Sequence, residues 1–242
     1  MTLRHPLVTV TARTAFRWHV LGQNRRMAAR VRALLVDWGG VLTTDLQDAM
    51  GSWCETDRID YALFQRVLSD WLGESFGEEA RVNPVHALER GEMLVPHFEA
   101  ELAWRLRTVD ERPVEPEGLV DRMFAGFRHR PEMHRVVRRV RRAGRKTGLV
   151  SNSWGNDYPR ESWAELFDVV VISGEVGMRK PEPRIYLHAA AALGVEPQEC
   201  VFVDDLASNV EGAAEVGMIA VHHRTLEATV AELETLFALR LR

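Results

Sequence analysis

Five short apolar runs recur along the chain, and polar or turn-forming residues bound each of them. The runs are rich in Val, Ile and Leu, which is typical of parallel strands covered on both faces of a sheet. They are Ala33–Val36, Gly148–Val150, Val169–Ile172, Val201–Val203 and Ile219–Val221. The pattern therefore predicts a parallel sheet.

Segments with helical periodicity separate the later strands, and a glycine follows each one where a helix would stop. The predicted helices are Glu132–Ala143, Ile185–Leu193 and Asn209–Val216, with Gly144, Gly194 and Gly217 as the stops. Strands and helices that alternate in this way favour a doubly wound α/β fold. In such a sheet, ligands bind beyond the carboxyl ends of the strands.

The stretch between the first two predicted strands departs from this alternation. Residues 45–130 contain no convincing strand, show helical periodicity through Tyr61–Trp71 and His97–Arg107, and carry several glycine and proline breakers. We expect a small helical cap, inserted after the first strand, that covers a pocket at the carboxyl end of the sheet. The α/β core domain then comprises residues 27–44 and 131–242.

The first 26 residues differ in composition from the rest of the chain. They contain five arginines and no acidic residue, which resembles an organellar transit peptide, but the lack of serine argues against that interpretation. A secretory signal would need a compact apolar region, which is also missing. Met27 stands just before the first predicted strand. We expect residues 1–26 to be a disordered tail or an over-extended reading frame.

Composition narrows the possible partners. Of the 242 residues, 46% are hydrophobic, which is enough for a full core, and no apolar run approaches the length that crosses a bilayer. From Met27 onward, 26 basic residues face 35 acidic ones, and the resulting net charge of about −9 repels nucleic acid. Cys54 and Cys200 match no disulfide framework and no metal-ligand spacing. We expect a cytoplasmic protein without nucleic-acid or membrane partners, and the sequence leaves the oligomeric state open.

Polar side chains stand after four of the predicted strands. In strand order they are Asp37, then Ser151 and Asn152, then Lys180 in a longer loop, then Asp204 and Asp205. A lone aspartate after a strand is most often a turn or capping residue. Three carboxylates, an ammonium and a hydroxyl at one edge, however, make a charge-balanced site for a divalent metal and a phosphate group.

Four segments around these residues resemble, in order, the motifs of the haloacid dehalogenase (HAD) superfamily. The segments are VDWGGVL, LVSNSW, GMRKPEPRIY and VFVDDLASNVEGAAEVGM, and the resemblance runs from about Arg32 to the C-terminus. LERGEM, VSNSWGND and GMRKPEPRIY are most similar to the helical-cap group that includes the phosphatase domain of soluble epoxide hydrolase and the sugar-1-phosphate phosphatases. The resemblance implies a HAD-like Rossmannoid core with a helical cap, and Mg²⁺-dependent hydrolysis of a phosphate ester.

The resemblance and the charges together give each residue an expected role. Asp37 is the expected nucleophile, which forms an aspartyl phosphate. The expected Mg²⁺ ligands are Asp37, the Gly39 carbonyl, Asp205 and, directly or through water, Asp204. Lys180 would neutralise the transferred group, to which Ser151 and the Asn152 amide would donate hydrogen bonds. The expected substrate-binding residues are Gly39, Gly40, Ser151, Asn152, Trp154 and Lys180. Asn209 either orients the metal-side loop or starts a helix.

Gly39 departs from the superfamily pattern, in which most phosphatases carry a second aspartate that protonates the leaving alcohol. General acid–base assistance is worth about 10²–10⁴-fold in rate. A site without it should favour activated leaving groups, such as those of sugar 1-phosphates. Asp45, Asp48 or Asp157 could supply a proton, although each also fits an ordinary surface or capping role.

Two other functions remain open on the sequence. Gly39 could mark a catalytically impaired protein that keeps the fold as a binding module. A 2-haloacid dehalogenase would use the same aspartate, but it needs no metal, so nothing would offset the charge of Asp204 and Asp205. We favour the enzyme because Asp37, Ser151, Lys180 and Asp205 all occur in order.

Three further patterns have a structural and a functional interpretation. Trp38, Trp53 and Trp154 could form an aromatic wall beside the substrate or simply pack in the interior. The run RVVRRVRRAGRK has an apolar stripe of three valines, which favours a solvated helix face over an anion site. His222 and His223 lack a third ligand, so a zinc site is not expected.

Overall fold

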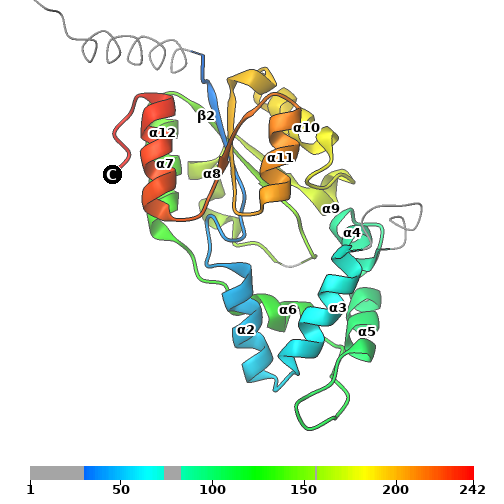
Figure 1. Ribbon diagram of the computed structural model, residues 1–242. Coiled ribbons are helices and arrows are strands. Elements are labelled where there is room, and N and C mark those ends of the chain that lie inside the picture. The colour runs from blue at the N-terminus through cyan, green and yellow to red at the C-terminus, as the bar shows by residue number, and fades with distance from the viewer. Residues whose placement is uncertain (1–29, 74–82, 156) are drawn as a thin grey trace, which may run out of the picture.

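The computed structural model describes residues 30–73, 83–155 and 157–242, so the predicted tail at residues 1–26 lies outside them. Five parallel strands form one sheet in the order β3-β2-β1-β4-β5 (Figure 1). The strands are β1 (Ala33–Val36), β2 (Lys146–Ser151), β3 (Val169–Ile172), β4 (Cys200–Asp204) and β5 (Ile219–His222). Every predicted strand is present, and β1 and β3 have the predicted bounds.

Helices cover both faces of the sheet because successive strand residues point to opposite sides. Leu34 and Val36 belong to one buried cluster, whereas Ala33 and Leu35 belong to another. The first cluster is completed by α7 (Pro131–Arg142), α8 (Trp163–Leu166) and α12 (Leu226–Phe237), and the second by α10 (Pro183–Leu193) and α11 (Ala207–Glu215). The predicted doubly wound α/β fold is confirmed. No helix in the described ranges has the length and apolar character that crossing a bilayer requires.

The insertion between β1 and α7 is helical and has its own interior. Its helices are α2 (Leu46–Thr56), α3 (Tyr61–Gly73), α4 (Pro84–Glu89), α5 (Val95–Arg105) and α6 (Leu119–Phe124). They enclose a buried cluster that includes Trp53, Phe64, Phe98 and Leu102. In the described part of the insertion, isolated β-bridges occur but no strand does. Figure 1 shows these helices as a separate layer beyond one end of the sheet.

The two chain segments that join the insertion to the sheet lie side by side. The Arg130 N–H donates to the Leu42 carbonyl at 2.8 Å, and the Thr44 N–H donates to the Arg128 carbonyl at 2.8 Å. This pairing fixes the point at which the insertion leaves the sheet. Because Leu42 comes shortly after β1, the insertion faces the carboxyl ends of the strands.

Candidate active site

Asp37 and the Asp204–Asp205 pair meet where the strand order reverses. β1 and β4 are neighbours with Val36 opposite Val203, and the Asp37 N–H donates to the Val203 carbonyl at 2.9 Å. Carboxylate oxygens of Asp37, Asp204 and Asp205 all lie within 4.8 Å of one another. Doubly wound sheets bind ligands at such a switch point. The spacing is close to that of ligands around a single cation.

Lys180 lies between two of these carboxylates. Its side chain is 1% exposed, and its Nζ is 2.6 Å from Asp37 Oδ1 and 2.7 Å from Asp204 Oδ2. Burial acts to lower the pKa of Lys180, but the attraction of Asp204 and Asp37 outweighs it and raises that pKa. Lys180 is therefore a permanent cation fixed against Asp37.

The carboxyl groups outnumber the cation that faces them, since three carboxyl groups meet one ammonium group. Burial raises the pKa of Asp37 to about 8; Lys180 opposes this shift, whereas Asp204 and Asp205 add to it. Burial and then Asp204 raise the pKa of Asp205 to about 6. The raised pKa values show that these carboxyl groups disfavour one another's ionisation, and a divalent cation would balance the charge of their ionised forms.

Asp204 has both oxygens engaged by the protein. Besides Lys180, it accepts hydrogen bonds from the Leu206 N–H at 2.9 Å and from Asn209 Nδ2 at 3.0 and 3.2 Å. Asn209 lies in the first turn of α11, whose N-cap is Leu206, so its amide orients Asp204 instead of capping the helix. Metal binding by Asp204 stays a prediction. Because both oxygens already accept hydrogen bonds, these contacts support binding through a water molecule over direct coordination.

Gly40 leaves room for Asp205. It has φ +68°, and a Cβ at this position would lie 2.0 Å from Asp205 Oδ2. Its N–H donates to the Thr44 carbonyl at 3.3 Å, within the turn. A Cβ at Gly39, in contrast, would meet nothing within 4 Å. The substrate-binding role expected of Gly40 stays a prediction, whereas its steric role is plain from the geometry.

Gly40→Ala is expected to lower kcat/KM at least about tenfold more than Gly39→Ala. An alanine at Gly40 must adopt a left-handed conformation and push Asp205 away, whereas an alanine at Gly39 has free space. Steady-state kinetics of the two variants over a range of Mg²⁺ concentrations measure this difference. Equal losses in the two variants would contradict the steric role of Gly40.

Ser151 and Asn152 follow β2 at the same edge of the sheet. Ser151 Oγ lies 3.0 Å from Tyr158 Oη. The Asn152 side chain donates to the Lys180 carbonyl at 3.0 Å and accepts from the Lys180 N–H at 2.8 Å. Asn152 therefore holds the backbone of Lys180 in place. The hydrogen bonds expected from Ser151 and the Asn152 amide to a phosphoryl group stay predictions.

A cavity of about 100 Å³ lies between the sheet edge and the insertion. Its polar wall contains Asp37, Gly39, Ser151, Asn152, Lys180, Asp205 and Asn209, and its aromatic wall contains Trp38, Phe124, Phe127, Trp154 and Tyr158. The sequence thus identified two of the five rings. Trp53 is not among them, because it packs inside the insertion and donates to Asp57 Oδ2 at 2.9 Å.

Trp154 and Glu89 link the sheet to the insertion. Trp154 packs edge-on against Phe98 and Phe124, and its Nε1 donates to Glu89 Oε1 at 3.2 Å. Glu89 ends α4, lines the cavity and forms an ion pair with Arg179 from the sheet side. The motif LERGEM contains Glu89, but nothing in its pattern predicts that this side chain reaches the site.

Tyr158 is another residue that sequence reasoning missed. Its ring packs edge-on against Trp38, with 5.7 Å between the ring centroids. Burial raises the pKa of its hydroxyl group, which therefore stays protonated. No sequence signal marked it, because it comes from an irregular loop seven residues after Ser151.

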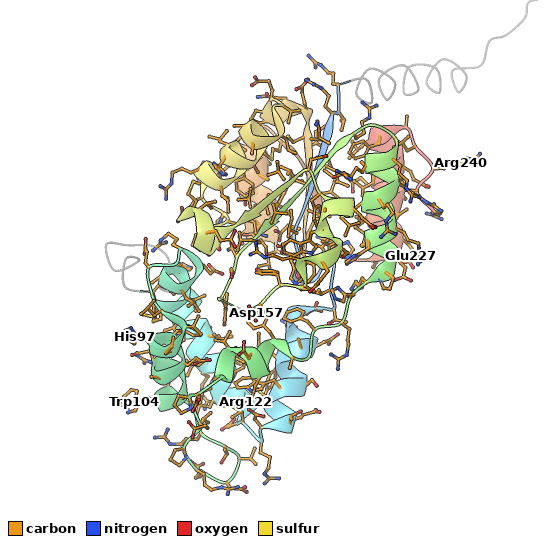
Figure 2. The ribbon with its side chains drawn as sticks, turned by 180° about the vertical axis from the view of Figure 1, so that it is seen from behind. His97, Trp104, Arg122, Asp157, Glu227 and Arg240 are labelled. Carbon is orange, nitrogen blue, oxygen red and sulfur yellow. The ribbon has the colours of Figure 1, made fainter. Side chains whose placement is uncertain are left out.

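The aspartates predicted as alternative proton donors do not line the cavity. Asp45 caps α2 by accepting from the Gln47 N–H at 2.7 Å, and Asp48 is exposed on that helix. Asp157 is exposed as well, and Figure 2 shows it on the loop facing the insertion.

His222 and His223 have separate partners. His222 Nε2 lies 2.9 Å from the Asp205 carbonyl, next to the carboxylate cluster, and His223 Nδ1 lies 2.8 Å from Thr229 Oγ1. Neither belongs to the potential metal-ligand group found in the described residues.

The fold and the site define a doubly wound α/β core with a carboxylate–lysine centre at the switch point and a helical insertion over it. The profile of haloacid dehalogenase-like hydrolases matches residues 31–217, and the chain belongs to this family.

Characterised relatives match parts of the chain. Mouse bifunctional epoxide hydrolase 2 is 33% identical over 120 residues, which is 46% of this chain and 22% of that protein. Glyceraldehyde 3-phosphate phosphatase of Methanopyrus kandleri is 34% identical over 113 residues, covering 43% and 47% of the two chains. Phosphoserine phosphatase of Thermus thermophilus is 36% identical over 146 residues, covering 52% and 58%. The matches thus span between about a fifth and three fifths of the relatives' lengths.

Solved structures of low sequence identity share the fold. A HAD family enzyme of Bacteroides thetaiotaomicron, bt-2542, superposes with a TM-score of 0.61 at 19% identity, covering 84% of this chain and 98% of that one. The same enzyme in complex with magnesium and inorganic phosphate gives a TM-score of 0.59 at 19% identity, covering 82% and 98%.

Proposed function

We propose that the chain is a Mg²⁺-dependent phosphatase that hydrolyses a small phosphorylated metabolite through an aspartyl phosphate at Asp37. The observation that carries the proposal is the buried contact of Lys180 with Asp37, beside Asp205 and next to a cavity that the same residues line. The names of two relatives, glyceraldehyde 3-phosphate phosphatase and phosphoserine phosphatase, support a phosphate ester as substrate.

The donor set fits Mg²⁺. The groups that would hold the ion are carboxylate oxygens of Asp37 and Asp205 and the Gly39 carbonyl. Asp204, which accepts a hydrogen bond from Asn209, would contact the ion through water. Once bound, the ion would supply positive charge to the phosphoryl oxygens and to the carboxylates around them.

The chain's own residues would divide the chemistry between them. A carboxylate oxygen of Asp37 attacks phosphorus as the ester bond on its far side breaks, and water then hydrolyses the acyl phosphate. Lys180 offsets the charge on the transferred group, and because its side chain is buried it acts as a fixed cation. Ser151 donates its hydroxyl hydrogen to a phosphoryl oxygen, and Asn152 keeps Lys180 in position.

The cavity favours an activated leaving group such as that of a sugar 1-phosphate. Gly39 offers no acidic side chain, so little protonation is available at the ester oxygen. The rings of Trp38, Trp154 and Phe127 suit the apolar face of a sugar. A volume of about 100 Å³ holds only a small group, so a larger substrate requires the insertion to move away from the sheet.

Gly39→Asp is expected to raise kcat/KM for alkyl phosphates by about tenfold or more relative to p-nitrophenyl phosphate. The added carboxyl group has space at this position and can protonate a poor leaving group, which p-nitrophenolate does not need. Gly39→Asn is the matched control, because it has the same size but provides no acid. An unchanged ratio of the two substrates, or an equal effect of asparagine, would contradict the explanation.

A phosphate-ester panel with and without Mg²⁺ tests the proposed function. It should include glyceraldehyde 3-phosphate, phosphoserine, sugar 1-phosphates and p-nitrophenyl phosphate. We expect Mg²⁺-dependent phosphate release with sugar 1-phosphates among the better substrates. The second candidate function is a non-catalytic binding protein, because Gly39 stands where most phosphatases of the family have an aspartate. Binding without turnover across the panel would support it. Metal-independent release of halide from 2-haloacids would instead point to a dehalogenase.

A further inference from the structure

A second cavity lies at the opposite edge of the sheet from Asp37. It has a volume of about 610 Å³ and includes Lys146, the first residue of β2, and Asp168, which precedes β3. Because the strands are parallel, these amino ends face away from the carboxyl ends that carry the candidate active site. The cavity is therefore independent of the phosphatase site.

Basic side chains dominate this second cavity, which we call the arginine cavity. Arg138, Arg141, Arg142, Arg145 and Lys146 line it, and Glu165 and Asp168 are its acidic residues. It thus has an excess of three positive charges in a chain whose net charge is −4. Such a local excess in a concave surface attracts anions.

The acidic residues of the arginine cavity neutralise only part of this charge. Asp168 accepts from the Thr147 N–H at 2.9 Å, and its other oxygen lies 3.1 Å from Arg141 Nη2. Glu165 reaches Arg138 only at 3.9 Å, and its side chain is 74% exposed. Asp168 therefore fixes Arg141 in place, whereas Glu165 contributes a weak, solvent-screened pair.

Two of the cations that line the arginine cavity, Arg142 and Lys146, are exposed to solvent. Within the described ranges, Arg142 and Lys146 take part in no ion pair. The Nε atoms of Arg138 and Arg141 are buried and have no hydrogen-bond acceptor there. Buried donors without acceptors are uncommon in folded proteins. Both atoms belong to arginines that line the cavity, so the protein itself leaves the donors of this cluster incompletely paired.

The cavity is more than a solvated helix face. Met133, Val136, Val137 and Val140 anchor α7 on the sheet, which fixes the direction of its arginines. The strand β2 and the segment before β3 supply the other walls, so the residues converge from separate elements. By contrast, Arg135 on the same helix lies outside the cavity and pairs with Glu132 at 3.1 Å.

We propose that the arginine cavity binds the polyphosphate group of a small metabolite, with the chemistry of a nucleoside di- or triphosphate. The volume is within the range of about 300–1,000 Å³ that is typical of small-molecule sites. Planar guanidinium groups bind phosphate oxygens in pairs, and three excess positive charges match a di- or triphosphate better than a monophosphate. The established family membership does not assign any ligand to this place.

Calorimetric titration of inorganic tripolyphosphate into the full chain tests the proposal. The protein carries Asp37→Asn and the buffer contains EDTA, so that the probe is not hydrolysed. We expect saturable binding that Arg142→Ala/Lys146→Ala weakens about tenfold or more. Arg135→Ala/Arg139→Ala removes the same charge from α7 outside the cavity and should weaken binding less than about threefold.

Further titrations distinguish the ligand chemistry. ADP and ATP should bind in the same place, whereas AMP and inorganic phosphate should bind far more weakly. If ATP binds no more tightly than tripolyphosphate, the phosphate chain is the part that the cavity recognises. Because Arg142 and Lys146 are exposed, unchanged thermal unfolding should confirm that the variant is folded. Equal weakening by both double variants, or no saturable binding of tripolyphosphate, would overturn the proposal.

Discussion

Replacing Asp37 with asparagine is expected to lower kcat for phosphate-ester hydrolysis by at least about 10³-fold. The amide has almost the same size as the carboxylate, but it cannot attack phosphorus and form an acyl phosphate. It also removes one of the two carboxylates that face Lys180 and one of the expected metal ligands. Phosphate release measured at saturating substrate and Mg²⁺ gives the size of the effect.

The matched control for this change is Asp110→Asn. Asp110 is an exposed residue of the insertion that pairs with Arg58, and it lies outside the cavity. Its loss should leave kcat within about twofold, because an exposed ion pair contributes little. Comparable activity of Asp37→Asn and the unaltered chain would refute the role of Asp37, whatever the substrate.

Replacing Lys180 with methionine is expected to reduce both activity and stability. Methionine keeps the length of the side chain but leaves Asp37 and Asp204 facing each other without a cation. Removing one partner from a buried charge cluster costs about 3–5 kcal/mol of unfolding free energy. We also expect kcat to fall at least about 10²-fold, because the fixed charge beside the transferred group is lost.

The stability loss of Lys180→Met should depend on pH. Burial already raises the pKa of Asp37 from 3.8 to about 8, and loss of the opposing lysine raises that pKa further. A carboxyl group whose pKa is raised by folding binds its proton more tightly in the folded state, so stability rises as the pH falls. Denaturant unfolding without added metal should therefore show a smaller deficit near pH 5 than near pH 8. Lys146→Met, at an exposed position, is the control, and an equal deficit at both pH values would contradict the electrostatic cause.

The sheet and its acidic edge could be predicted because their signals are local. Each strand is a short apolar run, and Asp37, Ser151 and Asp204 follow or end such runs directly. Parallel strands bring their carboxyl ends together whatever the loops do between them. The helices α7, α10 and α11 begin and end within two residues of the predicted bounds because glycines mark where they stop.

The roof of the cavity could not be predicted, because it depends on packing between distant segments. Phe124 and Phe127 end the insertion, Glu89 ends α4, and Tyr158 lies in a loop without periodicity. Nothing in the sequence distinguishes Trp53, which is buried inside the insertion, from Trp154, which joins it to the sheet. Those choices depend on the orientation of the insertion, which only the folded chain defines.

Mass spectrometry of the Asp37 peptide after rapid acid quench tests the central claim most directly. The protein is mixed with p-nitrophenyl phosphate and Mg²⁺, quenched during the first turnover and digested. The proposed mechanism predicts a phosphoryl group on Asp37 that is absent without Mg²⁺ and absent in Asp37→Asn. Phosphate release at the normal rate with an unmodified Asp37, or with the phosphoryl group on another residue, would contradict it.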